Sequence, residues 1–150
     1  MLRPFVGQVG KFPILNSKLR AAIDRVAAEP DQRQALELAY ELMSRRYRGY
    51  RFRTYLYLWR AFEEAPNILW ERQGFLHCHQ QNLLLRVLLI ESGWFKPEEI
   101  EVGYSLVWYI SPHQYLRVKI AGRWLALDPW NATYGAKINQ YAVGFGFGEL

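Results

Sequence analysis

The only cysteine of the chain, Cys78, lies between two of its three histidines, His77 and His79, in the stretch GFLHCHQQ. Cysteine and histidine side chains are common zinc ligands, and a cysteine thiolate is also a nucleophile that can attack a carbonyl carbon. The remaining possibility is an inert thiol in the core, where unpaired cysteines are often found. The elements that surround the stretch decide among these three interpretations.

The spacing of these three residues argues against a metal site. Successive side chains of a helix point about 100° apart, so His77, Cys78 and His79 cannot all converge on one ion. A single cysteine also excludes a four-cysteine zinc site. The segment GFGFG at 144–148 lacks the lysine, the hydroxyl and the following helix of a phosphate-binding loop, and it predicts a Gly-rich turn or a frayed end. We therefore expect no metal and no cofactor.

Cys78 begins a run that contains no helix breaker until Gly93. Apolar residues fill nearly every face from Leu83 to Ile90, which predicts a central helix buried on several sides. At the start of a helix, unpaired amide groups and the positive end of the helix dipole stabilise a thiolate. Upstream, amphipathic patterns predict one helix after Asn16 and a second from about Asp31 to near Gly49, and TYLYLWRAF at 54–62 favours a further helix.

Three antiparallel strands are predicted after the central helix. Alternating apolar residues from Val102 to Ile110 indicate the first strand, and the runs HQYLRVKI and RWLALDP on either side of Ala121-Gly122 indicate a hairpin. A two-residue loop places Ile120 opposite Arg123. This register gathers five uncharged residues on one face, namely Leu116, Val118, Ile120, Leu125 and Leu127.

The same register makes His113 and Asp128 diagonal neighbours on the other face of the hairpin. Their Cα atoms would lie about 7–8 Å apart, a distance that the two side chains can close to a hydrogen bond. Pro129 biases Asp128 to an extended conformation at the end of its strand. A nucleophile needs a base, and the base needs an orienting partner, so Cys78, His113 and Asp128 predict a catalytic triad.

This order of elements resembles the transglutaminase-like superfamily of papain-like cysteine enzymes: a cysteine at the head of a buried helix, a histidine opening one strand, and Asp-Pro after Gly-x-Trp. The match covers residues 67–135 of a single expected domain, 1–150, and leaves the helical part, 1–62, unmatched. The resemblance implies an α+β fold in which the central helix packs on an antiparallel sheet, with additional N-terminal helices. It also implies that Cys78 is the nucleophile, His113 the general base and acid, and Asp128 the group that orients the imidazole.

The chemistry expected of this triad is acyl transfer on a peptide or protein amide through a thioester, with hydrolysis favoured over cross-linking to an amine. The oxyanion donors would be the Cys78 amide and a side chain of Gln73 or Trp70. Trp130 would wall the cleft, and one of the flanking histidines, with His79 as the candidate, would tune the thiolate. The alternative is an inactive binding or scaffolding module. Many family members have Gly two residues before the cysteine and Ala-Trp after the histidine, where this chain has Leu76 and Gln114-Tyr115.

Much of the positive charge behind the net charge of +5 lies in residues 45–55, where arginines alternate with aromatic residues. We call this segment the basic-aromatic cluster. Its members are Arg45, Arg46, Tyr47, Arg48, Tyr50, Arg51, Phe52, Arg53 and Tyr55. Such interleaving can stack single-stranded nucleic acid. We favour a helix end with aromatic anchors, because no nucleic-acid-binding motif accompanies the cluster. The chain also shows no signal peptide and no membrane span, so we expect a cytoplasmic protein. The sequence leaves the oligomeric state open.

Overall fold

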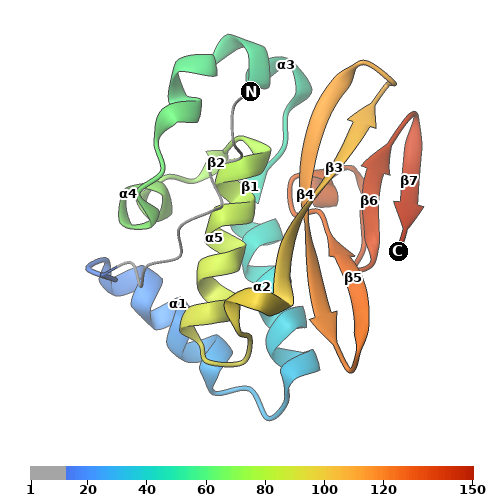
Figure 1. Ribbon diagram of the computed structural model, residues 1–150. Coiled ribbons are helices and arrows are strands. Elements are labelled where there is room, and N and C mark those ends of the chain that lie inside the picture. Colours follow the sequence, from blue (N-terminus) through green and yellow to red (C-terminus); the bar gives the residue numbers. More distant parts are fainter. Residues whose placement is uncertain (1–12) are drawn as a thin grey trace.

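The computed structural model describes residues 13–150, which form a mixed α and β fold with helices on one side of a small antiparallel sheet (Figure 1). The helices and helical turns are α1 Ser17–Ala27, α2 Gln32–Arg46, α3 Arg51–Leu56, η1 Leu58–Phe62, α4 Pro66–Glu71, α5 Cys78–Glu91, η2 Pro97–Glu99 and η3 Asn131–Tyr134. The strands are β1 Tyr47–Arg48, β2 Gly74–Phe75, β3 Ile100–Val107, β4 Ser111–Ile120, β5 Arg123–Leu127, β6 Gln140–Val143 and β7 Gly146–Glu149.

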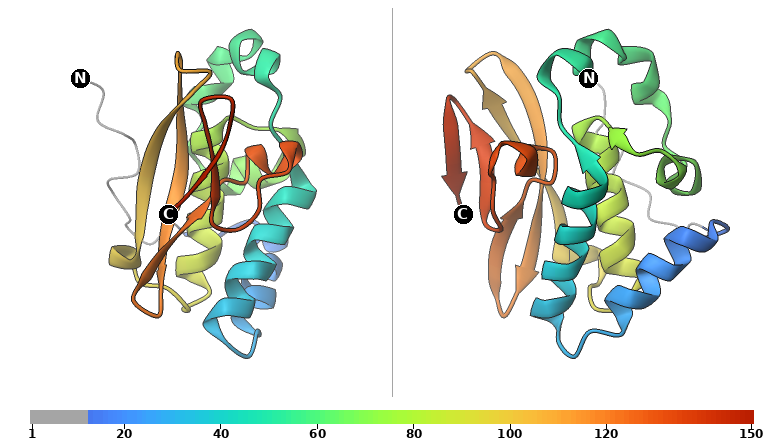
Figure 2. Two further views of the ribbon diagram at one scale, coloured as in Figure 1. Left: turned by 90° about the vertical axis from the view of Figure 1, so that its right-hand side faces the viewer. Right: turned by 180° about the vertical axis from the view of Figure 1, so that it is seen from behind.

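Helix α5 is the centre of the fold. Leu84, Leu85, Leu88 and Leu89 are fully buried. Helices α1, α2 and α4 contact α5, and strand β4 contacts it as well, so a helix apolar on nearly every face is enclosed (Figures 1 and 2). The prediction of a buried central helix beginning at Cys78 is confirmed. None of the helices among residues 13–150 is long and apolar enough to cross a lipid bilayer.

The two N-terminal helices begin where predicted, and each has a capping side chain. The Asn16 side chain accepts hydrogen bonds from the Lys18 and Leu19 amide groups at 2.9 and 3.0 Å, and Asp31 accepts one from the Gln34 amide at 2.8 Å. These caps satisfy amide groups that a helix leaves without an internal acceptor. Both helices then bury their apolar stripes against the core.

The sheet has the order β3-β4-β5, and its hairpin has the predicted register. Ile120 pairs with Arg123 and Leu116 pairs with Leu127. Leu116, Leu127 and Val118 are fully buried in the core, so the uncharged face of the hairpin is the face that packs on the helices. A register shifted by one residue would have exposed this face to water.

The first strand is shorter than predicted. β3 ends at Val107 rather than Ile110, because Trp108 and Tyr109 have φ angles of 53° and 59° and turn the chain into β4. The alternation of apolar residues continues through the turn, which is why the pattern suggested a longer strand. Because the chain turns at Trp108 and Tyr109, Trp108 leaves the sheet and lines a pocket.

The C-terminal segment is a hairpin whose turn includes Gly144, as the Gly-rich pattern predicts, but residues 146–149 form strand β7 rather than a frayed end. Strands β6 and β7 pair in antiparallel fashion and lie on the side of the sheet away from the helices (Figure 2). The ring of Tyr141 stacks on that of Tyr115 with centroids 4.2 Å apart. Val107 also forms a bridge with Gly144, which fastens the hairpin to the end of β3.

Candidate functional site

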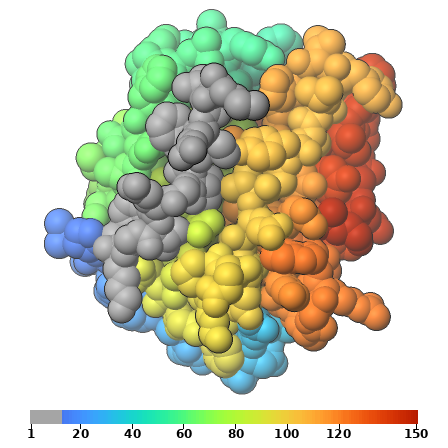
Figure 3. All heavy atoms as spheres, in the orientation of Figure 1, coloured from blue at the N-terminus to red at the C-terminus, as the bar shows by residue number. Residues whose placement is uncertain are grey.

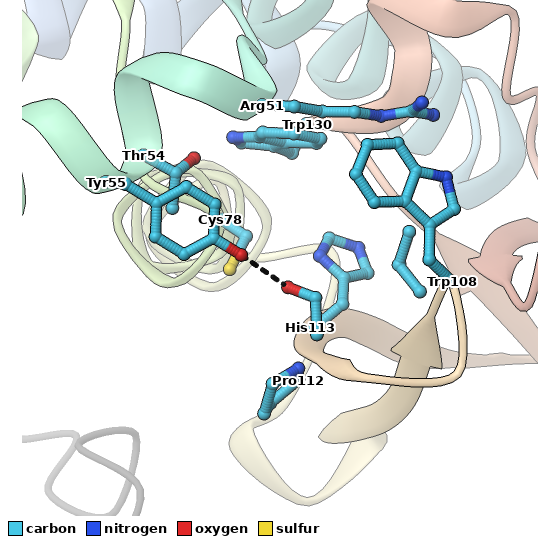
Figure 4. A pocket seen from close by; sticks show the side chains of 10 residues that line it. Arg51, Thr54, Tyr55, Cys78, Trp108, Pro112, His113 and Trp130 are labelled. Atoms are coloured by element: carbon cyan, nitrogen blue, oxygen red, sulfur yellow. Dashed lines mark hydrogen bonds between the residues drawn. The ribbon is translucent and has the colours of Figure 1, made fainter.

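A pocket lies where α3, the start of α5, the β3–β4 turn and the segment after β5 meet. Cys78, His113 and Trp130 line this pocket, together with Arg51 and Tyr55 from α3 (Figure 4). Figure 3 shows the green α3–η1 segment meeting the orange end of the β3–β4 hairpin at one end of the molecule. We call this the Cys78 pocket.

Cys78 is the first residue of α5, where its amide group has no acceptor within the helix. The helix start is held by Gln80, whose Oε1 accepts a hydrogen bond from the His77 amide at 3.1 Å. Gln80 Nε2 donates to the carbonyl oxygens of Arg60 and Glu63 at 2.6 and 3.0 Å. These bonds tie the segment after α3 to the start of α5 and so fix one wall of the pocket relative to the thiol.

The structure brings His113 and Asp128 into direct contact, as the hairpin register predicts. His113 Nε2 donates a hydrogen bond to Asp128 Oδ2 over 2.8 Å, and the two side chains are only 6% and 0% exposed. Since Nε2 is engaged by the carboxylate, Nδ1 is the ring nitrogen that remains for the thiol. Strand β5 ends at Leu127, which pairs with Leu116, so the first residues of β4 have no partner on the β5 side. Ser111, Pro112 and His113, the first three residues of β4, line the Cys78 pocket at this open edge.

Asn131 is a further member of the site that the sequence interpretation missed. The side-chain Nδ2 of Asn131 donates to Asp128 Oδ2 at 2.8 Å and lies 3.1 Å from His113 Nε2. The backbone amide of Asn131 donates to Asp128 Oδ1 at 3.2 Å. The Ala142 amide donates to the same Oδ2 at 3.0 Å. The signal was present in the spacing, because an aspartate commonly accepts a hydrogen bond from a residue a few positions ahead at a turn.

The surroundings of the thiol favour an ion pair of thiolate and imidazolium. Burial alone raises the pKa of Cys78, but hydrogen bonds with His113 and His79, and the charge of His113, lower that pKa to about 6. Burial alone lowers the pKa of His113, but its hydrogen bonds with Asp128 and Cys78 and their charges raise it to about 10. Between these two values the thiolate and the charged imidazole are the dominant forms.

The histidines beside Cys78 are held by two different carbonyl groups. His79 Nε2 donates to the Ala61 oxygen at 2.7 Å, and His77 Nε2 pairs with the Tyr57 oxygen at 3.0 Å. Burial acts to lower the pKa of His79, but its hydrogen bond with Cys78 and the Ala61 carbonyl raise it overall. Burial lowers the pKa of His77. His79 is therefore the flanking histidine that bears on the thiol, whereas His77 helps to fix the wall of the pocket.

The structure does not bring Gln73 and Trp70 to the Cys78 pocket. Both line a separate cavity between α1 and the end of α2, and Trp70 packs on Tyr47 with ring centroids 6.0 Å apart. They are directed there because β1 and β2 pair side by side and turn the segment before Cys78 toward α2. Neither residue is therefore placed to donate a hydrogen bond to an oxyanion at Cys78. Trp130, in contrast, does wall the pocket, with its ring 5.9 Å from that of His113.

Several arginines of the basic-aromatic cluster pack on aromatic rings of the same chain. The Arg46 guanidinium lies 4.7 Å from the Trp70 ring, and that of Arg53 lies 4.4 Å from the Tyr50 ring. Arg45 pairs with Glu41 on the exposed face of α2 at 2.5 Å. These contacts agree with the interpretation of a helix end with aromatic anchors. Two members, Arg51 and Tyr55, also line the Cys78 pocket, which the interpretation did not include.

Gly49 sets the position of Trp130. A Cβ atom at residue 49 would collide with the indole ring and the carbonyl oxygen of Trp130. We expect Gly49→Ala to lower the free energy of unfolding by about 1–3 kcal/mol, because the enclosed ring must move to admit it. Urea unfolding followed by tryptophan fluorescence measures this change. Gly146→Ala is the matched control, since a Cβ there meets open space, and equal effects of the two substitutions would contradict the role of Gly49.

No protein-family model matches the chain, and comparisons with curated proteins and with solved structures found no match either. Among residues 13–150, no group of three or more His, Cys, Asp or Glu side chains is placed to hold a metal ion. The chemistry of the Cys78 pocket must therefore be argued from its own residues.

Proposed function

We propose that the protein is a cysteine-dependent acyl-transfer enzyme of the transglutaminase-like, papain-like kind, acting on a peptide or protein amide. The observation that carries the proposal is the Cys78 thiol at the start of a buried helix, in one pocket with a histidine that donates a hydrogen bond to a fully buried aspartate. A thiol with a pKa lowered to about 6 is ionised at neutral pH, which is what a nucleophile requires. The Asp128 carboxylate keeps the ring oriented.

The proposed reaction has two halves. The Cys78 thiolate attacks the amide carbonyl carbon, the C–N bond breaks, and His113 gives its Nδ1 proton to the departing nitrogen. The thioester that results is then attacked by water, which transfers a proton to His113, and the carboxylic acid product leaves as the thiolate returns. An amine in place of water would give cross-linking. We propose hydrolysis as the main outcome, since water needs no binding surface of its own.

Two donors are available for the oxyanion of this reaction. The Cys78 amide is one, because the first position of a helix leaves it free. The indole N–H of Trp130 is the second, because Trp130 lines the same pocket as Cys78 and its Nε1 has no hydrogen-bond partner among residues 13–150. A buried donor without an acceptor costs free energy, and an acceptor supplied by substrate would explain why it is kept.

The proposal is tested by incubating the protein with a peptide library and measuring three products: new peptide termini, released ammonia and incorporated amine. We expect cleavage or ammonia release by the wild type and neither by Cys78→Ser, because a serine hydroxyl is a far weaker nucleophile in a site built for a thiolate. Amine incorporation alone would change the assignment from hydrolase to cross-linking enzyme. Silence of the wild type in all three measurements would contradict acyl transfer and favour the binding module.

Trp130→Phe is expected to lower kcat about 100-fold, because it removes the indole N–H and keeps a ring in the pocket wall. The pH dependence of Cys78 alkylation should stay unchanged, since neither the thiol nor His113 is altered. Trp124→Phe on β5 is the control, because Trp124 stacks with Arg117 rather than lining the pocket. A Trp130→Phe enzyme with undiminished kcat would remove the indole from the oxyanion site.

A further inference from the structure

Arg51 is the first residue of α3, and its side chain forms part of the wall of the Cys78 pocket. Its guanidinium carbon lies 4.7 Å from the centroid of the Trp108 ring and 4.5 Å from that of Tyr134. Figure 4 shows the side chain passing over Trp130 with its charged end beside Trp108. Stacking on two rings holds a long side chain in one place, so this charge has a defined position at the edge of the pocket.

No carboxylate of residues 13–150 forms an ion pair with this guanidinium. The ion pairs of the arginines in this part of the chain join Arg33 with Glu37, Arg45 with Glu41, and Arg117 with Glu101. Arg51 Nε is enclosed without a hydrogen-bond partner, and the Arg51 guanidinium forms no hydrogen bond with another residue of 13–150. The pocket therefore presents a positioned positive charge whose hydrogen-bond donors are not used by any residue of the part of the chain that the structure describes.

The other residues that line the Cys78 pocket do not neutralise the charge of Arg51. Val107, Trp108, Pro112 and Trp130 contribute apolar and aromatic surface, and the thiolate of Cys78 is paired with His113. An arginine fork of this kind matches the two oxygens of a carboxylate, and hydrogen bonds between two charged groups are among the strongest in proteins. The positive net charge of the chain adds a long-range attraction for anionic peptides.

We propose that Arg51 is a specificity-determining residue that binds a carboxylate of the substrate while the reacting amide lies at Cys78, so that the preferred substrate is an acidic peptide. The inference rests on the proposed function of the Cys78 pocket and adds the substrate class to it. The carboxylate can belong to an Asp or Glu side chain or to the C-terminus of the peptide. Both sources present the same pair of oxygens, and they are distinguished by the test.

The test measures how peptides protect Cys78 from alkylation by iodoacetamide. The probes are acetylated hexapeptides of alanine and one phenylalanine, in which a single Asp or Asn occupies each position in turn, with an amidated C-terminus. A second series carries a free C-terminal carboxylate and no Asp. Alkylation without peptide, followed against pH, reports separately whether Cys78 is a thiolate, so a failure of the proposed function is recognised before any peptide is added.

We expect at least one acidic probe to half-protect Cys78 at a concentration about tenfold lower than its neutral counterpart. Protection by an Asp series assigns the site to side-chain carboxylates, and protection by the free C-terminus assigns it to terminal ones. Arg51→Gln should abolish the difference between acidic and neutral probes, and Arg51→Lys should retain part of it. Arg53→Gln is the control, because Arg53 lies on the same helix but does not line the pocket.

A purely structural role of Arg51 would change protection by the acidic and neutral probes by the same factor, and that result would overturn the inference. It would also be overturned by equal protection from every matched pair of probes on the wild type, including no protection by either member. If Arg51→Gln keeps the wild-type pH dependence of alkylation, the variant is folded around Cys78. If it does not, the comparison of acidic and neutral probes is made on Arg51→Lys instead.

Discussion

Replacing Asp128 by alanine is expected to lower the free energy of unfolding by about 3–5 kcal/mol, the cost typical of removing one member of a buried charged pair. Asp128 is fully buried and accepts hydrogen bonds from His113 Nε2, from the amide and the side chain of Asn131, and from the Ala142 amide. The substitution leaves all of these donors enclosed without an acceptor. The substitution therefore weakens both the turn after β5, through Asn131, and the contact of that turn with β6, through Ala142.

Urea unfolding at neutral pH measures this loss. Glu101→Ala is the control, because Glu101 is exposed and lies 3.5 Å from Arg117 on the surface of the sheet, where an ion pair contributes at most about 1 kcal/mol. A loss of less than about 1 kcal/mol for Asp128→Ala would show that water replaces the carboxylate without cost, and the buried network would then lose its structural role.

Replacing His113 by alanine is expected to lower the rate of amide turnover by about 1000-fold or more, the scale seen when one member of a catalytic triad is removed. The variant loses the group that keeps Cys78 ionised and the group that protonates the departing nitrogen. Turnover by purified wild type and variant, measured on the best peptide from the library, gives the ratio.

His79→Ala is the graded comparison for this prediction. His79 is fixed to the Ala61 carbonyl and contributes less than His113 to lowering the pKa of the thiol, so its loss should raise the pKa of Cys78 while proton transfer by His113 continues. We expect a smaller loss of turnover than for His113→Ala. If the two variants lost activity equally, His79 would be as essential as His113, and the order of roles proposed for the pocket would be incorrect.

The part of the site carried by the hairpin was predictable because a β-strand has a period of two. Once Ile120 is set opposite Arg123, the uncharged face and the diagonal contact of His113 with Asp128 follow from strand geometry. The beginning of α5 at Cys78 was predictable from the sequence, since the run without a helix breaker starts there. How the start of a helix docks on a strand edge depends on packing between elements, and no local pattern encodes it.

The walls of the pocket show where local patterns fail. Trp108 continues the alternation of β3 but belongs to a turn, because the left-handed φ of Trp108 and Tyr109 reverses the chain there. Arg51 and Tyr55 belong to a cluster whose local features indicate only a helix end, and α3 reaches the pocket through tertiary contacts, including the Tyr55 hydroxyl and that of Ser111, 3.3 Å apart. Gln73 was near Cys78 in sequence but lies in another cavity.

The most direct test of the Cys78 pocket is the pH dependence of Cys78 alkylation by iodoacetamide, compared between the wild type and His113→Ala. Since Cys78 is the only cysteine in the chain, the modified fraction reports on this thiol alone. We expect the wild-type rate to rise through an inflection near pH 6, because the pKa of the thiol is lowered to about 6, and we expect the inflection of the variant to move upward by two or more pH units, to about 8.5 or above. A thiol that titrates near about 8.5 in both proteins would contradict the thiolate and imidazolium pair, and with it the proposed nucleophile.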